Sequence, residues 1–316
     1  HRGSVVVCRP DGSVVEAWGA PDALVHPRSG IKPVQALPLV TTGAADAHGL
    51  TSEQLALACA SHSGAAVHVE LVTAWLARLG LTAADLACGP QEPADQAERD
   101  RLVRAGMAPT RAHDTCSGKH AGFLTLAHHL GVDAATSVDP DGEVQTRVAA
   151  AVAELTDCSV PVEMAVDGCS APTPVVALSG LATAMARFAV PRATGSSTLA
   201  DAAERLREAM AGHPLLVAGR GRACTELITA ARGGAVVKTG AEGVYVAVLP
   251  GPGVGVAVKI DDGATRAAEC VVAEMLVRLG ALDGDDPVAR RYRRAPVLDR
   301  NGAPVGSVVP APGWPG

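Results

Sequence analysis

The sequence predicts an α/β protein in which one antiparallel sheet is built from both ends of the chain, with a helical region inserted between them. A turn-forming Asp11-Gly12 pair near the start is flanked by Val-rich runs, which is typical of a hairpin. After residue 232, three more Val-rich runs are separated by Gly and Pro, whereas the middle of the chain carries the apolar spacing of helices. We therefore expect one domain, 1–316, with its sheet from 1–49 and 231–316 and its helical part from about 50 to 230.

The individual elements are assigned in chain order from the same patterns. The first hairpin takes 4–8 and 13–18. Residues 27–40 are expected as a loop that enters a helix, because Pro33 suits a helix's first turn. In the helix expected at 51–60, Ser52 is the expected cap. Further helices are expected at 69–79, 119–130, 143–155, 199–210 and 266–279, with a polar, helical or irregular segment at 81–106. Strands are expected at 234–239, 243–249 and 255–260, and the tail after Pro287 is expected as a loop that can include a strand.

Composition and charge exclude several function classes. Lys and Arg total 27 and Asp and Glu total 33, a net charge of −6, which disfavours an extended phosphate-binding surface. Three Trp, two Tyr and two Phe supply too few rings for base-stacking platforms. The longest uncharged stretch, 168–186, contains Pro172 and Pro174 and is expected as a buried loop and helix rather than a membrane span. Neither nucleic acid nor membrane is therefore expected as a partner.

Cysteine usage and the first residues indicate the compartment. Eight cysteines are scattered without a CxxC pair, and the start, His1-Arg2-Gly3, shows no apolar signal-peptide region. In a chain of this size without such a signal, the cysteines are expected to be reduced rather than bridged. The sequence therefore predicts a cytoplasmic protein.

Two short motifs carry candidate chemistry. Ser29 precedes Lys32 by three residues, so on a helix the hydroxyl and the amine share one face. A lysine amine can remove the proton that keeps a serine hydroxyl a weak nucleophile. Lys238-Thr239-Gly240 lies on an expected late strand. An S-x-x-K pair on an early helix with K-T-G on a late strand is the signature of serine β-lactamases and penicillin-binding proteins, and it favours acyl transfer. The Ser-Asp-Asn element of that signature is missing, and Ser61-His62-Ser63 is its nearest substitute.

Two cysteine-containing turns form a second group of candidates. Cys116-Ser117-Gly118-Lys119-His120 lies at an expected helix start, where the pKa of a cysteine is lowered. Asp167-Gly168-Cys169-Ser170 is another turn of this kind. The residues allow a nucleophilic thiolate, a clamp for a substrate carboxylate, a two-cysteine metal site, or Gly-mediated turns with buried thiols. Two cysteines and one histidine fall short of a four-ligand structural zinc site.

Several segments together resemble one family, the rhizobial-type L-asparaginases, which are distinct from the threonine-dependent bacterial asparaginases. The matching segments run in order from 28 to 243 and cover most of the chain. They are Arg28-Ser29-Gly30-Ile31-Lys32-Pro33 with Gln35-Ala36, Ala58-Cys59-Ala60-Ser61-His62-Ser63-Gly64, Cys116-Ser117-Gly118-Lys119-His120-Ala121-Gly122, Asp167-Gly168-Cys169-Ser170-Ala171-Pro172-Thr173-Pro174, His213-Pro214 with Val217-Ala218-Gly219, and Lys238-Thr239-Gly240-Ala241-Glu242-Gly243.

The resemblance implies a fold, an activity and a set of site residues. The fold would be similar to that of serine β-lactamases and glutaminases, in a homodimer, and the activity would be hydrolysis of the side-chain amide of L-asparagine to L-aspartate and ammonia. Two catalytic Ser–Lys pairs are implied, Ser29 with Lys32 and Ser61 with Lys238. One zinc ion per chain is also implied, beside the pocket. Its ligands would be Cys116, Lys119 and Cys169, and the substrate-binding positions would be Arg28, His62, His120, Asp167, Cys224 and Gly240.

The chemistry of amide hydrolysis agrees with these roles. An unactivated amide needs a strong nucleophile, a proton for the departing ammonia and an oxyanion hole. Ser29 would be the nucleophile and Lys32 its base. The like charge of Lys238 would favour the neutral form of the Lys32 amine. Ser61 would act as the proton shuttle. Backbone N–H groups of Ser29 and of the strand after Lys238 would form the oxyanion hole.

One departure from the family pattern and three alternatives stay open. Ala65-Ala66 stands where the resemblance leads us to expect Glu-Pro, and loss of that carboxylate could alter substrate orientation or metal affinity. The first alternative is a glutaminase or related amidase on the same scaffold. The second is a non-catalytic amino-acid-binding protein. The third is a zinc hydrolase that uses the two cysteines and the lysine as ligands.

Overall fold

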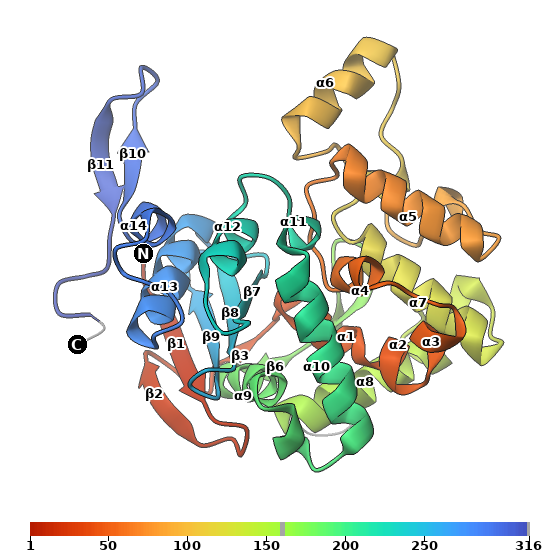
Figure 1. The fold of residues 1–316 in the computed structure, drawn as a ribbon, viewed down its shortest axis with the longest axis horizontal. Coiled ribbons are helices and arrows are strands. Elements are labelled where there is room, and N and C mark those ends of the chain that lie inside the picture. Colours follow the sequence, from red (N-terminus) through yellow and green to blue (C-terminus); the bar gives the residue numbers. More distant parts are fainter. Residues whose placement is uncertain (159–161, 315–316) are drawn as a thin grey trace.

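A five-stranded antiparallel sheet joins the two ends of the chain in the computed structural model, which describes residues 1–158 and 162–314 (Figure 1). Its strand order is β2-β1-β9-β8-β7. The strands are β1 (Gly3–Cys8), β2 (Val14–Trp18), β7 (Val236–Thr239), β8 (Val244–Leu249) and β9 (Val254–Ile260). The first strand pairs with the last, with Gly3 opposite Ile260 and Cys8 opposite Gly255. The predicted α/β class, with its sheet built from both chain ends, is confirmed.

Helices cover both faces of this sheet. α9 (Leu178–Ala189) packs on β1, β8 and β9, and α13 (Thr265–Arg278) packs on β8 and β9. Gly255 faces α9, since a Cβ there would come within 2.1 Å of a carbonyl oxygen of that helix. Successive side chains of a strand point to opposite faces, and Ile260 is an odd number of positions from Gly255. Ile260 therefore lies on the opposite face, where it lines a cavity beside α13. The two-sided cover explains why the Val-rich strands β8 and β9 are buried almost throughout.

The helical region lies beyond the β7 edge of the sheet in Figure 1. Its centre is α7 (Ser117–Leu130), which is buried from Ser117 to Ala127 and contacts α2, α3, α4, α5 and α8. The other helices and turns are η1 (Arg28–Ile31), α1 (Lys32–Gln35), α2 (Leu37–Thr41), α3 (Ala44–Ala47), α4 (Ser52–Ala58), α5 (Ala66–Arg78), η2 (Ala83–Asp85), α6 (Gln96–Ala105), η3 (Arg111–His113), η4 (Ala134–Thr136), α8 (Glu143–Thr156), η5 (Pro191–Thr194), α10 (Ser197–Gly212), α11 (Pro214–Val217) and α12 (Ala223–Ala230). Two short strand pairs join β3 (Leu24–Val25) to β6 (Val176–Ala177) and β4 (Met164–Val166) to β5 (Pro172–Pro174).

Most of the expected elements lie within a few residues of the observed ones, and the differences have local causes. The segment 27–40 is divided into η1, α1 and α2, with a proline in the first turn of each α-helix. The cap of α4 is Thr51 rather than Ser52. The Thr51 side chain accepts a hydrogen bond from the Gln54 backbone N–H, and the Gln54 side chain accepts one from the Thr51 N–H, which completes a capping box. Ser52 instead bonds His213 at 2.8 Å.

The tail after residue 286 is more ordered than expected. α14 (Pro287–Arg293) begins at Asp286, whose carboxylate accepts a hydrogen bond from the Val288 N–H. Asp followed by Pro is a helix-start signal, so the expectation of a loop there was wrong. β10 (Ala295–Leu298) and β11 (Pro304–Val308) then form a hairpin that projects from the body (Figure 1).

Two expectations about the chain as a whole can be compared with the structure. All eight cysteines are free, as predicted. Within residues 1–158 and 162–314, no helix has the length and apolar character needed to cross a membrane, and the uncharged stretch 168–186 forms β5, β6 and most of α9. The assignment of 1–316 to one domain stays a prediction.

Candidate active site

The two motif-bearing turns lie against each other at the end of β7. A Cβ at Gly240 would come within 2.6 Å of the Pro27 carbonyl oxygen, so only glycine lets the K-T-G turn approach the chain just before Ser29 so closely. A Cβ at Gly30 would lie 3.3 Å from the Val244 side chain on β8. η1 therefore packs across the ends of β7 and β8, which places the S-x-x-K and K-T-G motifs in one site.

A third segment supplies Ser61 to the same place. α4 ends at Ala58, and the chain after it is fixed on both sides, because the Ser61 N–H donates to the Val217 carbonyl at 3.0 Å and the His62 N–H donates to the Thr115 carbonyl at 3.2 Å. Gly118 at the start of α7 packs against α4, since a Cβ there would lie 2.3 Å from the Leu57 carbonyl oxygen. The helical region thus holds Ser61 rigidly against the sheet.

Ser61 lies between two buried lysine amines. Its Oγ is 3.0 Å from Lys32 Nζ and 2.8 Å from Lys238 Nζ. The two lysines are 0% and 1% exposed. Each amine also donates to a backbone carbonyl, Lys32 to Ala60 and Lys238 to Thr239, the latter at 2.7 Å. The predicted Ser61–Lys238 pair is therefore present, and Lys32 joins it as a second partner.

Burial and the neighbouring cation change the charge of Lys238. Burial, followed by the positive charge of Lys32, lowers the pKa of Lys238 to about 7. Near neutral pH a large fraction of this amine is therefore neutral. A neutral lysine amine can accept a proton, which an ordinary surface lysine cannot do at that pH. The geometry provides a base next to a serine hydroxyl.

Ser29 has different surroundings from Ser61. It is half-buried in η1, and its backbone carbonyl accepts the Lys32 N–H. Among the residues that the structure describes, none forms a hydrogen bond with the Ser29 hydroxyl, and the Lys32 amine turns instead to Ser61 and Ala60. The expected hydrogen bond between Ser29 and Lys32 is thus not formed in the free protein. The catalytic roles of both residues stay predictions.

Cys116, Lys119 and Cys169 come together as the resemblance implied. Lys119 Nζ donates to Cys169 Sγ at 3.2 Å, and all three residues are at most 6% exposed. A hydrogen bond with Cys169 holds the pKa of the Cys116 thiol well below its usual value, and the same bond raises the pKa of Cys169. Burial opposes the charge of Lys119, but the thiolate of Cys116 reverses this and raises the pKa of Lys119. The cluster therefore favours one thiolate beside one ammonium.

This donor set fits a zinc ion by its chemistry. Sulfur and nitrogen are the donors that zinc prefers, and three protein donors leave a fourth position open. Binding would displace the protons of Cys169 and Lys119, so it would be opposed by acid. Within the described part of the chain, no three His, Cys, Asp or Glu side chains are arranged to hold a metal, so the lysine would be an essential third ligand.

The two predicted histidines have opposite hydrogen-bond status. His62 Nδ1 accepts the Gly64 N–H at 3.1 Å, and its Nε2 lies 2.9 Å from Ser117 Oγ, which itself donates to a backbone carbonyl. The ring also stacks on His68 at 4.7 Å between centroids, so His62 acts in the scaffold of the Ser61 turn. His120 is 1% exposed, and among the described residues neither of its ring nitrogens has a hydrogen-bond partner. Burial lowers its pKa to about 3, so it is a neutral imidazole beside Lys119.

Cys224 and Tyr245 form a buried pair that contacts the K-T-G strand. Cys224 Sγ lies 3.0 Å from the Tyr245 hydroxyl and accepts the Thr239 backbone N–H at 3.3 Å. Both side chains are buried. These contacts anchor the strand that carries Lys238, and the predicted role of Cys224 in substrate binding stays a prediction. The sequence analysis missed Tyr245. The chain has only two tyrosines, and the position of this one in a Val-rich strand is a signal that could have identified it.

Arg28 and Asp167 form an ion pair beside Ser29. The Arg28 guanidinium donates from Nε and Nη2 to Asp167 Oδ1, both at 2.8 Å, and from Nη1 to Glu242. Asp167 belongs to the turn that carries Cys169, and Glu242 belongs to the turn that follows the K-T-G strand. Glu242 was not singled out by the sequence reasoning, because nothing local links it to Arg28.

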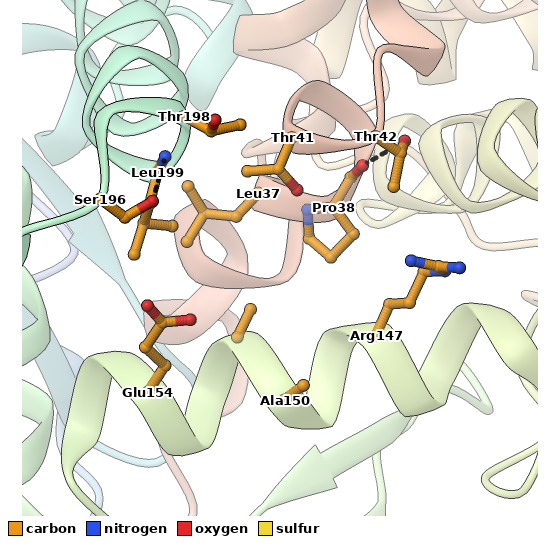
Figure 2. Close-up of a pocket in the computed structure, with 11 residues that line it drawn as sticks. Leu37, Pro38, Thr41, Thr42, Arg147, Ala150, Glu154, Ser196, Thr198 and Leu199 are labelled. Carbon is orange, nitrogen blue, oxygen red and sulfur yellow. Dashed lines mark hydrogen bonds between the residues drawn. The ribbon is translucent and has the colours of Figure 1, made fainter.

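A surface pocket of about 260 Å³ lies away from these residues. It is formed by α2, α8 and the start of α10, and Figure 2 shows Arg147 and Glu154 rising from α8 at its two sides. None of the predicted site residues lines it. It offers no nucleophile with a base, so it is not a candidate site for acyl transfer.

The sequence matches the family described as L-asparaginase II over residues 1–310. No curated protein matches it. Similar solved structures include a β-lactamase from Mycobacterium bovis (13% identity, TM-score 0.44, 89% of this chain and 95% of that chain covered). They also include a proposed β-lactamase from Bacteroides dorei (14% identity, TM-score 0.45, 88% of this chain and 92% of that chain covered). At these TM-scores the description of the fold rests on the sheet order and helices given above. The match over almost its whole length shows that the chain belongs to the L-asparaginase II family.

Proposed function

We propose that the protein is an L-asparaginase, which hydrolyses the side-chain amide of L-asparagine to L-aspartate and ammonia. The observation that carries this proposal is the Ser61 hydroxyl held between the buried amines of Lys32 and Lys238, next to the turn that carries Ser29. Membership of the L-asparaginase II family supports the same activity. The homodimer implied by the resemblance and the cytoplasmic location expected from the sequence stay predictions.

The two lysines and Ser61 can move a proton across the site. Lys238 is partly neutral near pH 7, and the Ser61 hydroxyl contacts both amines. This hydroxyl can therefore relay a proton between the two amines.

We assign the nucleophile to Ser29 because its hydroxyl is open to a ligand, whereas Ser61 is 8% exposed and enclosed by the amines. Ser29 Oγ attacks the amide carbon and gives its proton to Lys32. The proton is passed through Ser61 to the leaving nitrogen, and ammonia departs as the aspartyl ester of Ser29 forms. Water then attacks the ester carbon and gives its proton, through the same groups, to the departing Ser29 Oγ, which releases L-aspartate and restores the serine hydroxyl. Catalytic hydrogen bonds often tighten only when substrate binds, so the missing Ser29–Lys32 bond is compatible with this role.

A zinc ion would be held by Cys116 and Lys119 at the start of α7 and by Cys169 in the turn between β4 and β5. A bound zinc ion supplies a positive charge that can orient an oxygen ligand of the substrate. The chain's own residues supply the nucleophile and the proton transfers. The ion would therefore position the substrate rather than carry out hydrolysis.

Ammonia release from L-asparagine and L-glutamine, measured side by side on the purified protein, tests the proposal. We expect release from asparagine that depends on Ser29. Preference for glutamine would replace the proposal with a glutaminase. Binding of L-aspartate by calorimetry with no ammonia from either amide would overturn it in favour of an amino-acid-binding protein.

A further inference from the structure

Arg28, Asp167 and Glu242 form a charged rim beside the candidate nucleophile, and their exposures differ sharply. The side chains of Arg28 and Asp167 are 22% and 10% exposed, whereas that of Glu242 is 68% exposed. The inner pair is therefore a partly enclosed ion pair, and Glu242 covers the remaining outer edge of the guanidinium from solvent. An exposed ion pair of this kind contributes little to stability.

The backbone at this rim is held in unusual conformations. Arg28 has φ of 50° and Glu242 has φ of 58°, in the left-handed region that non-glycine residues seldom adopt. Lys259 fixes the second of them, because its amine donates to the Glu242 carbonyl at 2.8 Å. Strain of this type persists where surrounding contacts enforce it, and it is common at ligand clamps. The two turns are thus held so that the Glu242 carboxylate meets the Arg28 guanidinium.

We propose that Glu242 is an internal competitor for the carboxylate of the substrate. In the free protein it occupies the outer edge of the Arg28 guanidinium, and a carboxylate ligand replaces it there. The proposal rests on the proposed function, since L-asparagine and L-aspartate both carry the carboxylate that would displace Glu242. Glu242 would thereby set the affinity and the specificity of the site without taking part in the proton transfers.

The charges at the rim agree with such an exchange. One guanidinium faces two carboxylates, so the cluster has a surplus negative charge when it is empty. An amino-acid ligand brings one carboxylate to the guanidinium and one ammonium to the rim, so the ammonium can pair with the Glu242 carboxylate that leaves the guanidinium. A guanidinium recognises a carboxylate through two parallel N–H donors, and the Nη1 edge now held by Glu242 is the accessible one. Ligands without a carboxylate would leave Glu242 in place.

The test is Glu242→Gln, which keeps the size of the side chain and removes its charge. We expect the Kd for L-aspartate, measured by calorimetry, and the KM for L-asparagine to fall by about two- to fivefold. This range follows because the ligand no longer has to displace an exposed ion pair, which is worth only a small free energy. Hydrolysis of 3-aminopropanamide, which has the amide and the amine but no carboxylate, should gain nothing. Glu242→Asn is a second variant that tolerates a positive φ, and it should behave in the same way.

Glu143→Gln is the control, because Glu143 also forms an exposed ion pair with an arginine, Arg147 on α8. It should leave both constants unchanged. Unchanged or weaker L-aspartate binding in both Glu242 variants overturns the proposal. An equal fall in the KM for 3-aminopropanamide also overturns it, because that result would indicate a general change in the turn rather than the loss of a competing carboxylate. If the wild type releases no ammonia from any amide, the proposed function fails, while calorimetry with L-aspartate still decides the role of Glu242.

Discussion

The two serine-bearing turns of the candidate active site differ in how they are held. Ser61 follows α4, which is closed by a capping box at its start, and the Ser61 hydroxyl contacts two buried amines. Ser29 lies in η1, a short turn without a side-chain cap, and its hydroxyl is open. Under the proposed function, this difference suits the enclosed serine to proton transfer and the open serine to contact with the substrate.

The largest expected effect is at the open serine. Ser29→Ala should reduce kcat for L-asparagine by on the order of 10³-fold or more, because only binding and electrostatic assistance remain when a nucleophile is removed. Ammonia release measures this, with thermal unfolding to show that the fold is kept. Ser13→Ala, at the exposed turn of the first hairpin, is the control. Activity within about threefold of wild type would reverse the comparison and assign the attack to Ser61 or Cys116.

The next effect concerns the cysteine cluster beside both turns. We expect one zinc ion per chain in protein purified without metal affinity, and none in Cys116→Ala/Cys169→Ala. Elemental analysis measures this directly. The double variant Cys8→Ala/Cys270→Ala removes two other buried thiols, located in β1 and α13, and should keep its zinc. Equal zinc in the two double variants would show that the cluster is only a pair of buried thiols.

A smaller effect follows from the charge of Lys238. Its pKa is lowered to about 7, so protonation as the pH falls through 7 removes the base, and kcat/KM should drop by about tenfold between pH 8 and pH 6. Lys238→Arg, which stays protonated, should be inactive throughout. Circular dichroism at each pH checks that folding is constant. A flat profile from pH 6 to 8 would show that the enclosed serine does not depend on a neutral Lys238.

The smallest effect tests how the enclosed turn is anchored. Thr51→Ala removes the cap of α4 and should lower the free energy of unfolding by about 1 kcal/mol. Ser52→Ala is the matched control: Ser52 is the neighbouring hydroxyl and does not cap the helix, so its removal should cost less than about 0.5 kcal/mol. Chemical denaturation measures both. A larger loss from Ser52 would restore the cap predicted from sequence.

The zinc experiment also bears on Ala65, where the family pattern suggested a carboxylate. Ala65 precedes α5 and offers no side-chain cap to it. Zinc content and KM in an Ala65→Glu variant would show whether the missing carboxylate weakens either of them.

Much of the fold could be predicted from the sequence, because its signals are local. Val-rich runs and an Asp-Gly turn indicate the hairpin of β1 and β2, and an apolar spacing of 3.6 residues indicates the long helices. The family resemblance also implied Ser61 and Lys238 as partners, and their side chains lie 2.8 Å apart, while their catalytic roles stay predictions. The helix start at Asp286 carried a signal of the same local kind that was not used.

Tertiary structure alone decided which partner each group receives. Lys32 turns from Ser29 to Ser61 because α4 brings the Ala60 carbonyl and the Ser61 hydroxyl to its amine across 28 and 29 residues of chain. Glu242 meets Arg28 across 214 residues, and Tyr245 supports Cys224 across 21. The pKa of Lys238 depends on burial and on a distant cation, neither of which exists in the extended chain. Sequence determines which groups are present and which elements carry them, whereas long-range packing determines the distances and the solvent exclusion on which their chemistry depends.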